Sequence, residues 1–160
     1  DYRLILSCTN GEINVTGLKG ELASIDVVNG NIETNNITFN TLTVDTINGK
    51  IKVEACSKEF KASNINGPIE LTVIPSMSGR YELETVNGRV KVWILNAENI
   101  GVKIEAEATN GHISVDLPNV MVLEKGKRNL RAETKGYSEM NVKIELQIEA
   151  TNGNIYVASS

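Results

Sequence analysis

The chain has 160 residues, a formal net charge of −4 and a sequence pI of about 5.1. Its 41% hydrophobic and 22% charged residues are typical of a globular protein that buries a core within one domain. The acidic balance, with basic residues scattered among acidic ones, argues against a nucleic acid as partner. No apolar run approaches the roughly 18 residues that would span a bilayer, so we expect no membrane insertion by this segment.

The first residues and the cysteines bear on the cellular context. The sequence begins at Asp1 and runs directly into an apolar stretch, so a signal peptide or membrane anchor can lie outside this segment. Cys8 and Cys56 form no Cys-x-x-Cys pair, and the chain has a single His. This pattern is neither a disulfide scaffold nor a zinc framework. We therefore predict that both cysteines are small buried hydrophobic residues, and we expect no cofactor.

The dipeptide Asn-Gly recurs along the chain, and seven of the 13 Gly follow an Asn. Successive copies are 19, 19, 18, 21, 23 and 42 residues apart, which indicates a repeat protein. The copies are Asn10-Gly11, Asn29-Gly30, Asn48-Gly49, Asn66-Gly67, Asn87-Gly88, Asn110-Gly111 and Asn152-Gly153.

Apolar and polar residues alternate on both sides of each Asn-Gly, which is the pattern of half-buried strands. Counted from the Asn, positions −4, −2, +3 and +5 are apolar or small and should face inward. Position −3 is polar in every copy and should face solvent. The residues at −3 are Ser7, Asp26, Asp45, Ser63, Glu84, Glu107 and Glu149.

Two all-β folds fit this pattern. In a β-solenoid, each Asn-Gly is a corner with Gly at positive φ, and equivalent strands of successive coils stack about 4.8 Å apart. In the alternative, an antiparallel β-meander or sandwich, each Asn-Gly is the turn of a hairpin. We favour a single-domain β-solenoid of about eight repeats of 18–23 residues over residues 1–160, because a hairpin meander has no need for a constant period.

The solenoid hypothesis predicts two columns of stacked side chains. The corner Asn side chains would form an amide ladder that satisfies backbone groups at the bend. The residues at +3 would form an aliphatic ladder that drives folding, since burial of each side chain contributes about 1.5–3 kcal/mol. The residues at +3 are Ile13, Ile32, Ile51, Ile69, Val90, Ile113 and Ile155.

Residues 119–140 are the least repetitive stretch and read as an irregular insertion. The 42-residue gap before the last Asn-Gly is two periods of 21, so we expect that one repeat lost its Asn-Gly and absorbed an insertion near 130–137. The insertion is either a protruding loop or a cap over part of the solenoid.

Polar side chains in the repeats do not predict catalysis or metal binding. Turn chemistry accounts for the corner asparagines, and none of the four Asp lies in a calcium-binding Gly-Gly-x-Gly-x-Asp motif. The acidic residues at −3 face water rather than forming a carboxylate pair with separated pKa values. His112 occupies a position that tolerates many residue types and has no triad partner in a motif. We predict that the protein has no catalytic or metal site.

Trp93 and Tyr156 are the candidate ligand-binding residues. They lie six and four positions after their corner Asn, on outward positions, and an exposed Trp can stack on a sugar or anchor a protein partner. The alternative is that the 119–140 insertion covers Trp93.

The motif Thr-Asn-Gly-x-Ile-x-Val, its variant Val/Ile-Asn-Gly-x-Ile/Val-x-Val and the terminal Ile148-to-Val157 copy resemble the bacterial and archaeal putative-adhesin family, also called toast-rack domains. The resemblance covers nearly the whole chain. It implies a β-solenoid attached to the cell envelope, and the family offers no catalytic residues to match here.

The function we predict is a non-enzymatic, envelope-associated module that makes protein or polysaccharide contacts. Two alternatives stay open: a β-helix enzyme acting on polysaccharide, similar to the pectin-lyase group, and a self-assembling scaffold similar to bactofilins. Short coils with few Asp argue against the enzyme.

Overall fold

The computed structural model describes residues 2–160, and its regular structure is almost entirely β-strand. This confirms the all-β class. Two short 3-10 helices, η1 (Ala97–Asn99) and η2 (Tyr137–Glu139), lie in the connections. The strands are β1 (Arg3–Asn10), β2 (Ile13–Thr16), β3 (Lys19–Asn29), β4 (Ile32–Asn48), β5 (Ile51–Asn66), β6 (Ile69–Val73), β7 (Gly79–Asn87), β8 (Val90–Ile94), β9 (Gly101–Asn110), β10 (Ile113–Asp116), β11 (Val120–Lys125), β12 (Asn129–Thr134), β13 (Lys143–Asn152) and β14 (Ile155–Ser159).

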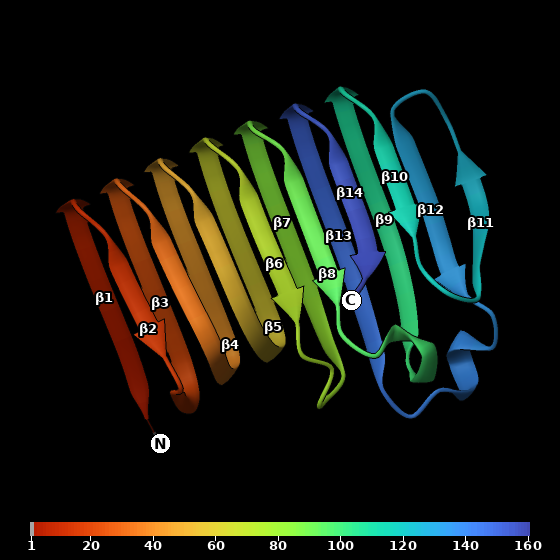
Figure 1. Cartoon of the computed structure of the whole chain (residues 1–160), viewed down its shortest axis with the longest axis horizontal. Helices are drawn as coiled ribbons and strands as arrows, with labels where there is room; N and C mark the ends of the chain where they lie inside the picture. Colours follow the sequence, from red (N-terminus) through yellow and green to blue (C-terminus); the bar gives the residue numbers. More distant parts are fainter. Residues whose placement is uncertain (1) are drawn as a thin grey trace.

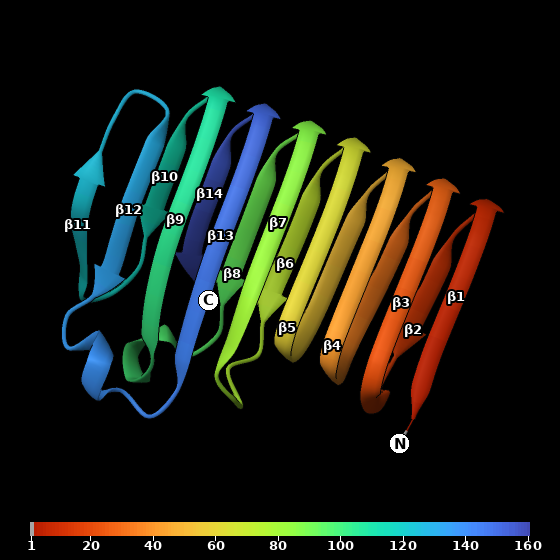
Figure 2. The ribbon, with the colours of Figure 1, turned by 180° about the vertical axis from the view of Figure 1, so that it is seen from behind.

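All fourteen strands belong to one sheet, which is parallel except at β12 and β11 and is curled into two rows that face each other. Figure 1 has the short row in front, and Figure 2 has the long row in front. The long row consists, in spatial order, of β1, β3, the C-terminal parts of β4 and β5, β7, β13, β9, β12 and β11. The short row is β2, N-terminal parts of β4 and β5, β6, β8, β14 and β10.

The order of the strands in space differs from their order in the chain. The first five Asn-Gly copies stack in sequence, but the last one lies between the fifth and the sixth. There, β13 pairs with both β7 and β9, while β14 pairs with both β8 and β10 (Figure 1). Stacking in simple chain order is therefore wrong for the C-terminal part.

The residues on the two sides of each Asn-Gly belong to different rows. Where the flanking strands pair, as β3 does with β4, they pair in parallel, so the Asn-Gly copies are not hairpin turns. The seven corner asparagines instead form one continuous amide ladder. Six bonds join them, in which Nδ2 of every corner Asn except Asn10 donates to Oδ1 of its neighbour at 2.8–3.0 Å. In space the order is Asn10, Asn29, Asn48, Asn66, Asn87, Asn152 and Asn110.

Backbone N–H groups at the corners donate to other backbone groups. The prediction that the corner Asn side chains satisfy them is therefore wrong. Gly30 N, for example, donates to Asn48 O at 2.8 Å. Behind the corner, three buried side chains bond to the Gly carbonyl of the neighbouring corner: Thr46 to Gly30, Asn64 to Gly49 and Thr85 to Gly67.

Glycine is required at the corners mainly because successive corners approach so closely. A Cβ at Gly49 would collide with the carbonyl oxygen of Gly30, and one at Gly88 with that of Gly67. Positive φ is not general: Gly49 has φ 155°, but Gly88 and Gly111 lie outside the range that disfavours L side chains. The predicted positive φ is therefore wrong for these two corners, where contact alone excludes a side chain.

We expect Gly88→Ala to lower the free energy of unfolding by about 2–3 kcal/mol, because the added methyl group must push two backbones apart. Gly136→Ala is the matched control, since Gly136 has φ 72° and open space around it. That control should cost only about 1 kcal/mol. Urea unfolding monitored by circular dichroism measures both, and a Gly136 variant as damaged as the Gly88 variant would contradict the contact explanation.

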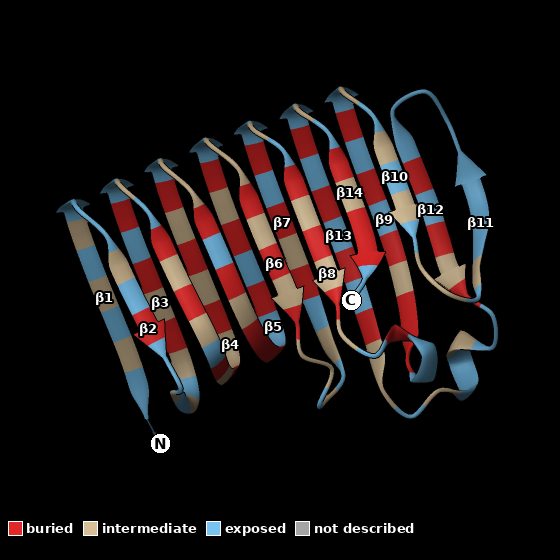
Figure 3. Cartoon of the chain, viewed as in Figure 1, coloured by how far each residue is buried: buried red, intermediate tan, exposed pale blue. Residues whose placement is uncertain are grey.

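The core lies between the two rows, where more buried and more exposed residues alternate along most strands, whereas β11 is almost entirely exposed (Figure 3). The +3 residues stack in register, as Ile32 does on Ile51 and Ile69 on Val90. Ile13 and Ile113 are only half-buried because they end the column. Cys56 is buried as predicted, whereas Cys8 is half-buried because β1 is an edge strand that pairs only with β3.

Residues 119–140 do not form a degenerate repeat. They contain β11 and β12, an antiparallel hairpin that extends the long row beyond β9, followed by η2. The short row stops at β10, two strands earlier, and Trp93 lies on that row in β8. The prediction of a lost repeat is therefore wrong, and the hairpin caps only the long row.

Candidate functional site

The two rows present outer faces of different chemistry near the C-terminal part of the sheet. The acidic residues at −3 lie in register on the long row, with Glu149 of β13 between Glu84 of β7 and Glu107 of β9. The basic residues after the corners, among them Arg89 and Lys91, lie on the short row. The corner therefore separates a long-row surface rich in glutamates from a short-row surface that carries Arg89 and Lys91, with Glu70 in register with Lys91.

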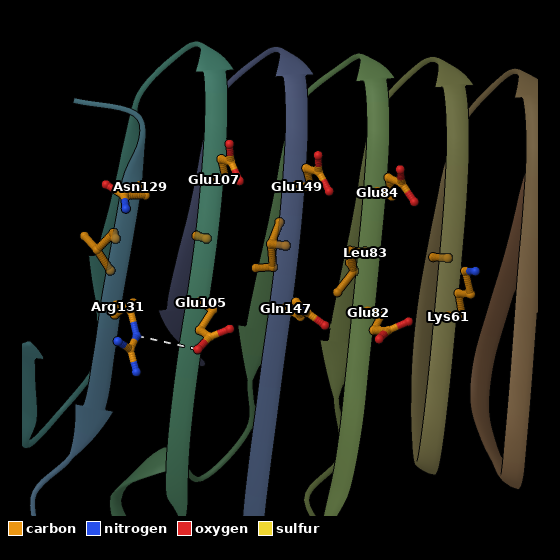
Figure 4. Close-up of a pocket in the computed structure, with 14 residues that line it drawn as sticks. Lys61, Glu82, Leu83, Glu84, Glu105, Glu107, Asn129, Arg131, Gln147 and Glu149 are labelled. Atoms are coloured by element: carbon orange, nitrogen blue, oxygen red, sulfur yellow. Dashed lines mark ion pairs between the residues drawn. The ribbon is translucent and has the colours of Figure 1, made fainter. Parts of the chain in front are cut away.

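The acidic face is the outer side of the long row around Glu82, Glu84, Glu105, Glu107 and Glu149. It lines a shallow hollow of about 470 Å³ (Figure 4). Lys61 and Arg131 border the hollow on opposite sides. Five carboxylates against two cations leave it negatively charged.

Ion pairs satisfy only part of the acidic face. Arg131 Nε lies 3.5 Å from Glu105 Oε1, and Arg80 Nη2 lies 3.3 Å from Glu82 Oε1. Within residues 2–160, Glu84, Glu107 and Glu149 have no salt-bridge partner, and no three His, Cys, Asp or Glu side chains gather as metal ligands. The face is a region of negative potential and holds no defined group of ligands.

Asp45, further along the same column, has a pKa raised above its usual value of 3.8. Partial burial is the largest cause and the charge of Asp26 the next, while Lys61 acts in the opposite direction. Asp26 is the in-register neighbour of Asp45. A raised pKa means that the folded state binds the proton more tightly than the unfolded state, so ionised Asp45 destabilises the fold.

We expect Asp45→Asn to stabilise the protein at pH 7, because it removes a partly desolvated charge next to Asp26. The gain should shrink as the pH falls through the raised pKa and vanish well below 3.8, where Asp45 is protonated in both states. Thermal unfolding across this pH range measures it. Asp116→Asn, an exposed site in β10, is the control, and a pH-independent gain at position 45 would contradict the electrostatic origin.

Trp93 and Tyr156 lie together on the short row. Their rings make an edge-to-face contact, with centroids 5.7 Å apart and planes at 70°. Both side chains are half-buried, and Ala158, the in-register neighbour of Trp93, is only 3% exposed. The contact exists because β14 is inserted beside β8.

A second hollow of about 380 Å³ adjoins Tyr156 and is lined mainly by apolar surface. Its polar side chains are Arg89 and Lys91 of the β8 coil, Asn154, and His112 and Ser114 of the β10 coil. No carboxylate lines it. The term aromatic patch refers below to Trp93, Tyr156, Arg89, Lys91 and His112.

Sequence reasoning placed Trp93 and Tyr156 on the outer surface, and the structure brings them into contact. His112 is exposed, at the rim of the same hollow. Arg89 and Lys91 were not predicted as binding residues. Their position close to Trp93 in the fifth copy was the one sequence feature that could have indicated a binding role. Only the insertion of β14 between β8 and β10 shows that they line the same hollow as Tyr156.

Comparisons with known proteins give three results. The family model Toastrack DUF4097 matches residues 3–158. A crystal structure of a putative cell adhesion protein from Clostridium sporogenes ATCC 15579 is similar at 12% sequence identity, with a TM-score of 0.47 over 99% of this chain and 93% of that chain. A search of curated proteins found no match. Within the described residues, no helix has the length and hydropathy required to cross a membrane.

Proposed function

Because this chain belongs to the Toastrack DUF4097 family, we propose that it is a non-enzymatic binding module of the cell envelope, built as a β-solenoid with seven Asn-Gly corners. Its ligand is an anionic polysaccharide, bound along the short row at the aromatic patch. The observation that supports this proposal most directly is the contact between Trp93 and Tyr156 beside a hollow whose charged side chains are basic.

Each part of the patch suits an acidic sugar chain. Aromatic rings offer apolar surface to the faces of sugar rings, and Tyr156 also has a hydroxyl group for hydrogen bonding. Arg89 and Lys91 supply positive charge for carboxylate or phosphate groups, with Arg able to bind either group in a bidentate manner. The flat sheet surface lets an extended chain contact several coils at once.

We expect the protein to bind polysaccharides that contain uronic acids or phosphodiesters and not to bind neutral glucans. Trp93→Ala should weaken this binding about tenfold, which corresponds to about 1.4 kcal/mol for an aromatic anchor. Affinity electrophoresis across a polysaccharide panel, followed by calorimetric titration of the best ligand, gives both results.

Tyr2→Ala is the matched control, since Tyr2 is an exposed aromatic residue near the N-terminus, 49% accessible, outside the patch. It should leave the affinity unchanged. Lys91→Ala should weaken binding at low salt more than at high salt, because salt screens the charge. Equal loss from Tyr2→Ala and Trp93→Ala, or binding to envelope proteins but to no polysaccharide, would contradict the proposal.

A second candidate function is self-assembly through the N-terminal end. There β1 and β2 are both edge strands, and Ile5 is 74% exposed. Leu4, Leu6 and Ile13 at this end are only partly buried. Open strand edges beside an apolar surface favour strand pairing with another copy. The opposite end also has an exposed edge strand, β11, but there the hairpin extends one row only, so the two rows do not present their edges together.

If the N-terminal end pairs two copies, we expect sedimentation velocity to detect a dimer that grows with concentration. Ile5→Lys should abolish it, since Lys on an edge strand blocks edge-to-edge pairing. Val122→Lys, on the exposed edge strand β11 at the other end, should leave the dimer intact. A monomer at all concentrations would rule out this candidate and leave the binding module unaffected.

A further inference from the structure

The seven Asn-Gly corners differ in the hydrogen bonding of the Gly nitrogen, the atom that governs the chemical stability of the preceding Asn. In six corners the Gly N–H donates to the Asn carbonyl of the neighbouring corner at 2.8–3.0 Å. Gly153 N, for example, donates to Asn110 O at 3.0 Å. Asn110 and Gly111 form the last corner of the stack, and within residues 2–160 Gly111 N has no hydrogen-bond acceptor.

This difference matters because the Gly nitrogen is the nucleophile in Asn deamidation. The nitrogen loses its proton to a base in water and attacks Cγ of the preceding Asn, forming a C–N bond and a five-membered succinimide. The C–Nδ2 bond breaks, and the amide leaves as ammonia with the displaced proton. Water then opens the ring at either carbonyl, giving aspartate or isoaspartate.

A hydrogen bond from the Gly N–H opposes the first step, since the proton is held by a carbonyl and the peptide is fixed by the neighbouring corner. At Asn110 the first restraint is missing, because Gly111 N has no acceptor among the described residues, and the peptide is held only through Asn110 O, which accepts from Gly153 N at 3.0 Å. The Asn110 side chain keeps one ladder bond, from Nδ2 to Asn152 Oδ1 at 2.8 Å, and the residue is exposed.

The surroundings of this corner favour the reaction further. The turn of the β11–β12 hairpin lies over it, and the two segments enclose a hollow of about 150 Å³. Lys125 and Lys127 line this hollow together with Gly111 and His112. Positive charge on this side of the corner favours the loss of a proton from Gly111 N.

We propose that Asn110 is the modification site of this chain, where spontaneous deamidation produces aspartate or isoaspartate, and that the stack protects the other six Asn-Gly copies. The product places a carboxylate where an amide donated to Asn152, so the terminal bond of the ladder is lost.

The test is to incubate the folded full chain at mildly alkaline pH and measure deamidation at each Asn-Gly by peptide mapping and mass spectrometry. The urea-unfolded chain provides the intrinsic rate of every site. For each site we compare the deamidation rate in the folded chain with the rate in the unfolded chain. This ratio should be at least about fivefold higher at Asn110 than at the other six sites, because at those six sites one hydrogen bond must break before the reaction.

Asn110→Gln is the matched variant, because Gln forms the corresponding six-membered ring slowly and retains an amide. It should remove the early acidic species seen by ion exchange. Equal protection at all seven sites, or fastest reaction at Asn10 at the other end of the ladder, would overturn the proposal. Persistence of the acidic species in Asn110→Gln would do the same.

Discussion

The stacking of one Asn-Gly corner on the next is the interaction on which the rest of the structure depends. It brings backbone to backbone so closely that a single Cβ would collide, and it aligns the amide ladder outside and the aliphatic column inside. Because the corners are in register, the strand segments next to them are in register in both rows too. The chain therefore specifies its sheet mainly at seven points, and the residues between them are free to vary on the outer side.

This freedom explains how one regular scaffold presents two unlike surfaces. Outward positions before a corner belong to the long row and outward positions after it to the short row. Glutamates gather on the first and basic residues with Trp93 on the second. Like charges on neighbouring strands lower stability, and the charge of Asp26 adds to partial burial in raising the pKa of Asp45.

The periodic part of the fold could be predicted from the sequence because Asn-Gly chemistry and alternation are local signals. The inward face, the +3 column and the outward position of Trp93 follow from counting residues. The position of β13 and β14 could not be predicted, because two equivalent coils compete for the same neighbours and no local signal ranks them. The same ambiguity concealed the contact between Trp93 and Tyr156. Residues 119–140 lack the period, so their antiparallel pairing had no sequence signature.

The placement of the final coil has a consequence for biosynthesis. Residues 143–159 are synthesised after β7 to β12, yet they lie between β7–β8 and β9–β10 in the finished sheet. A growing chain therefore cannot complete its stack in the order of synthesis. β9 and β10 lack one neighbouring strand each until β13 and β14 have been synthesised. Premature termination would consequently leave a break within the sheet instead of shortening one of its ends.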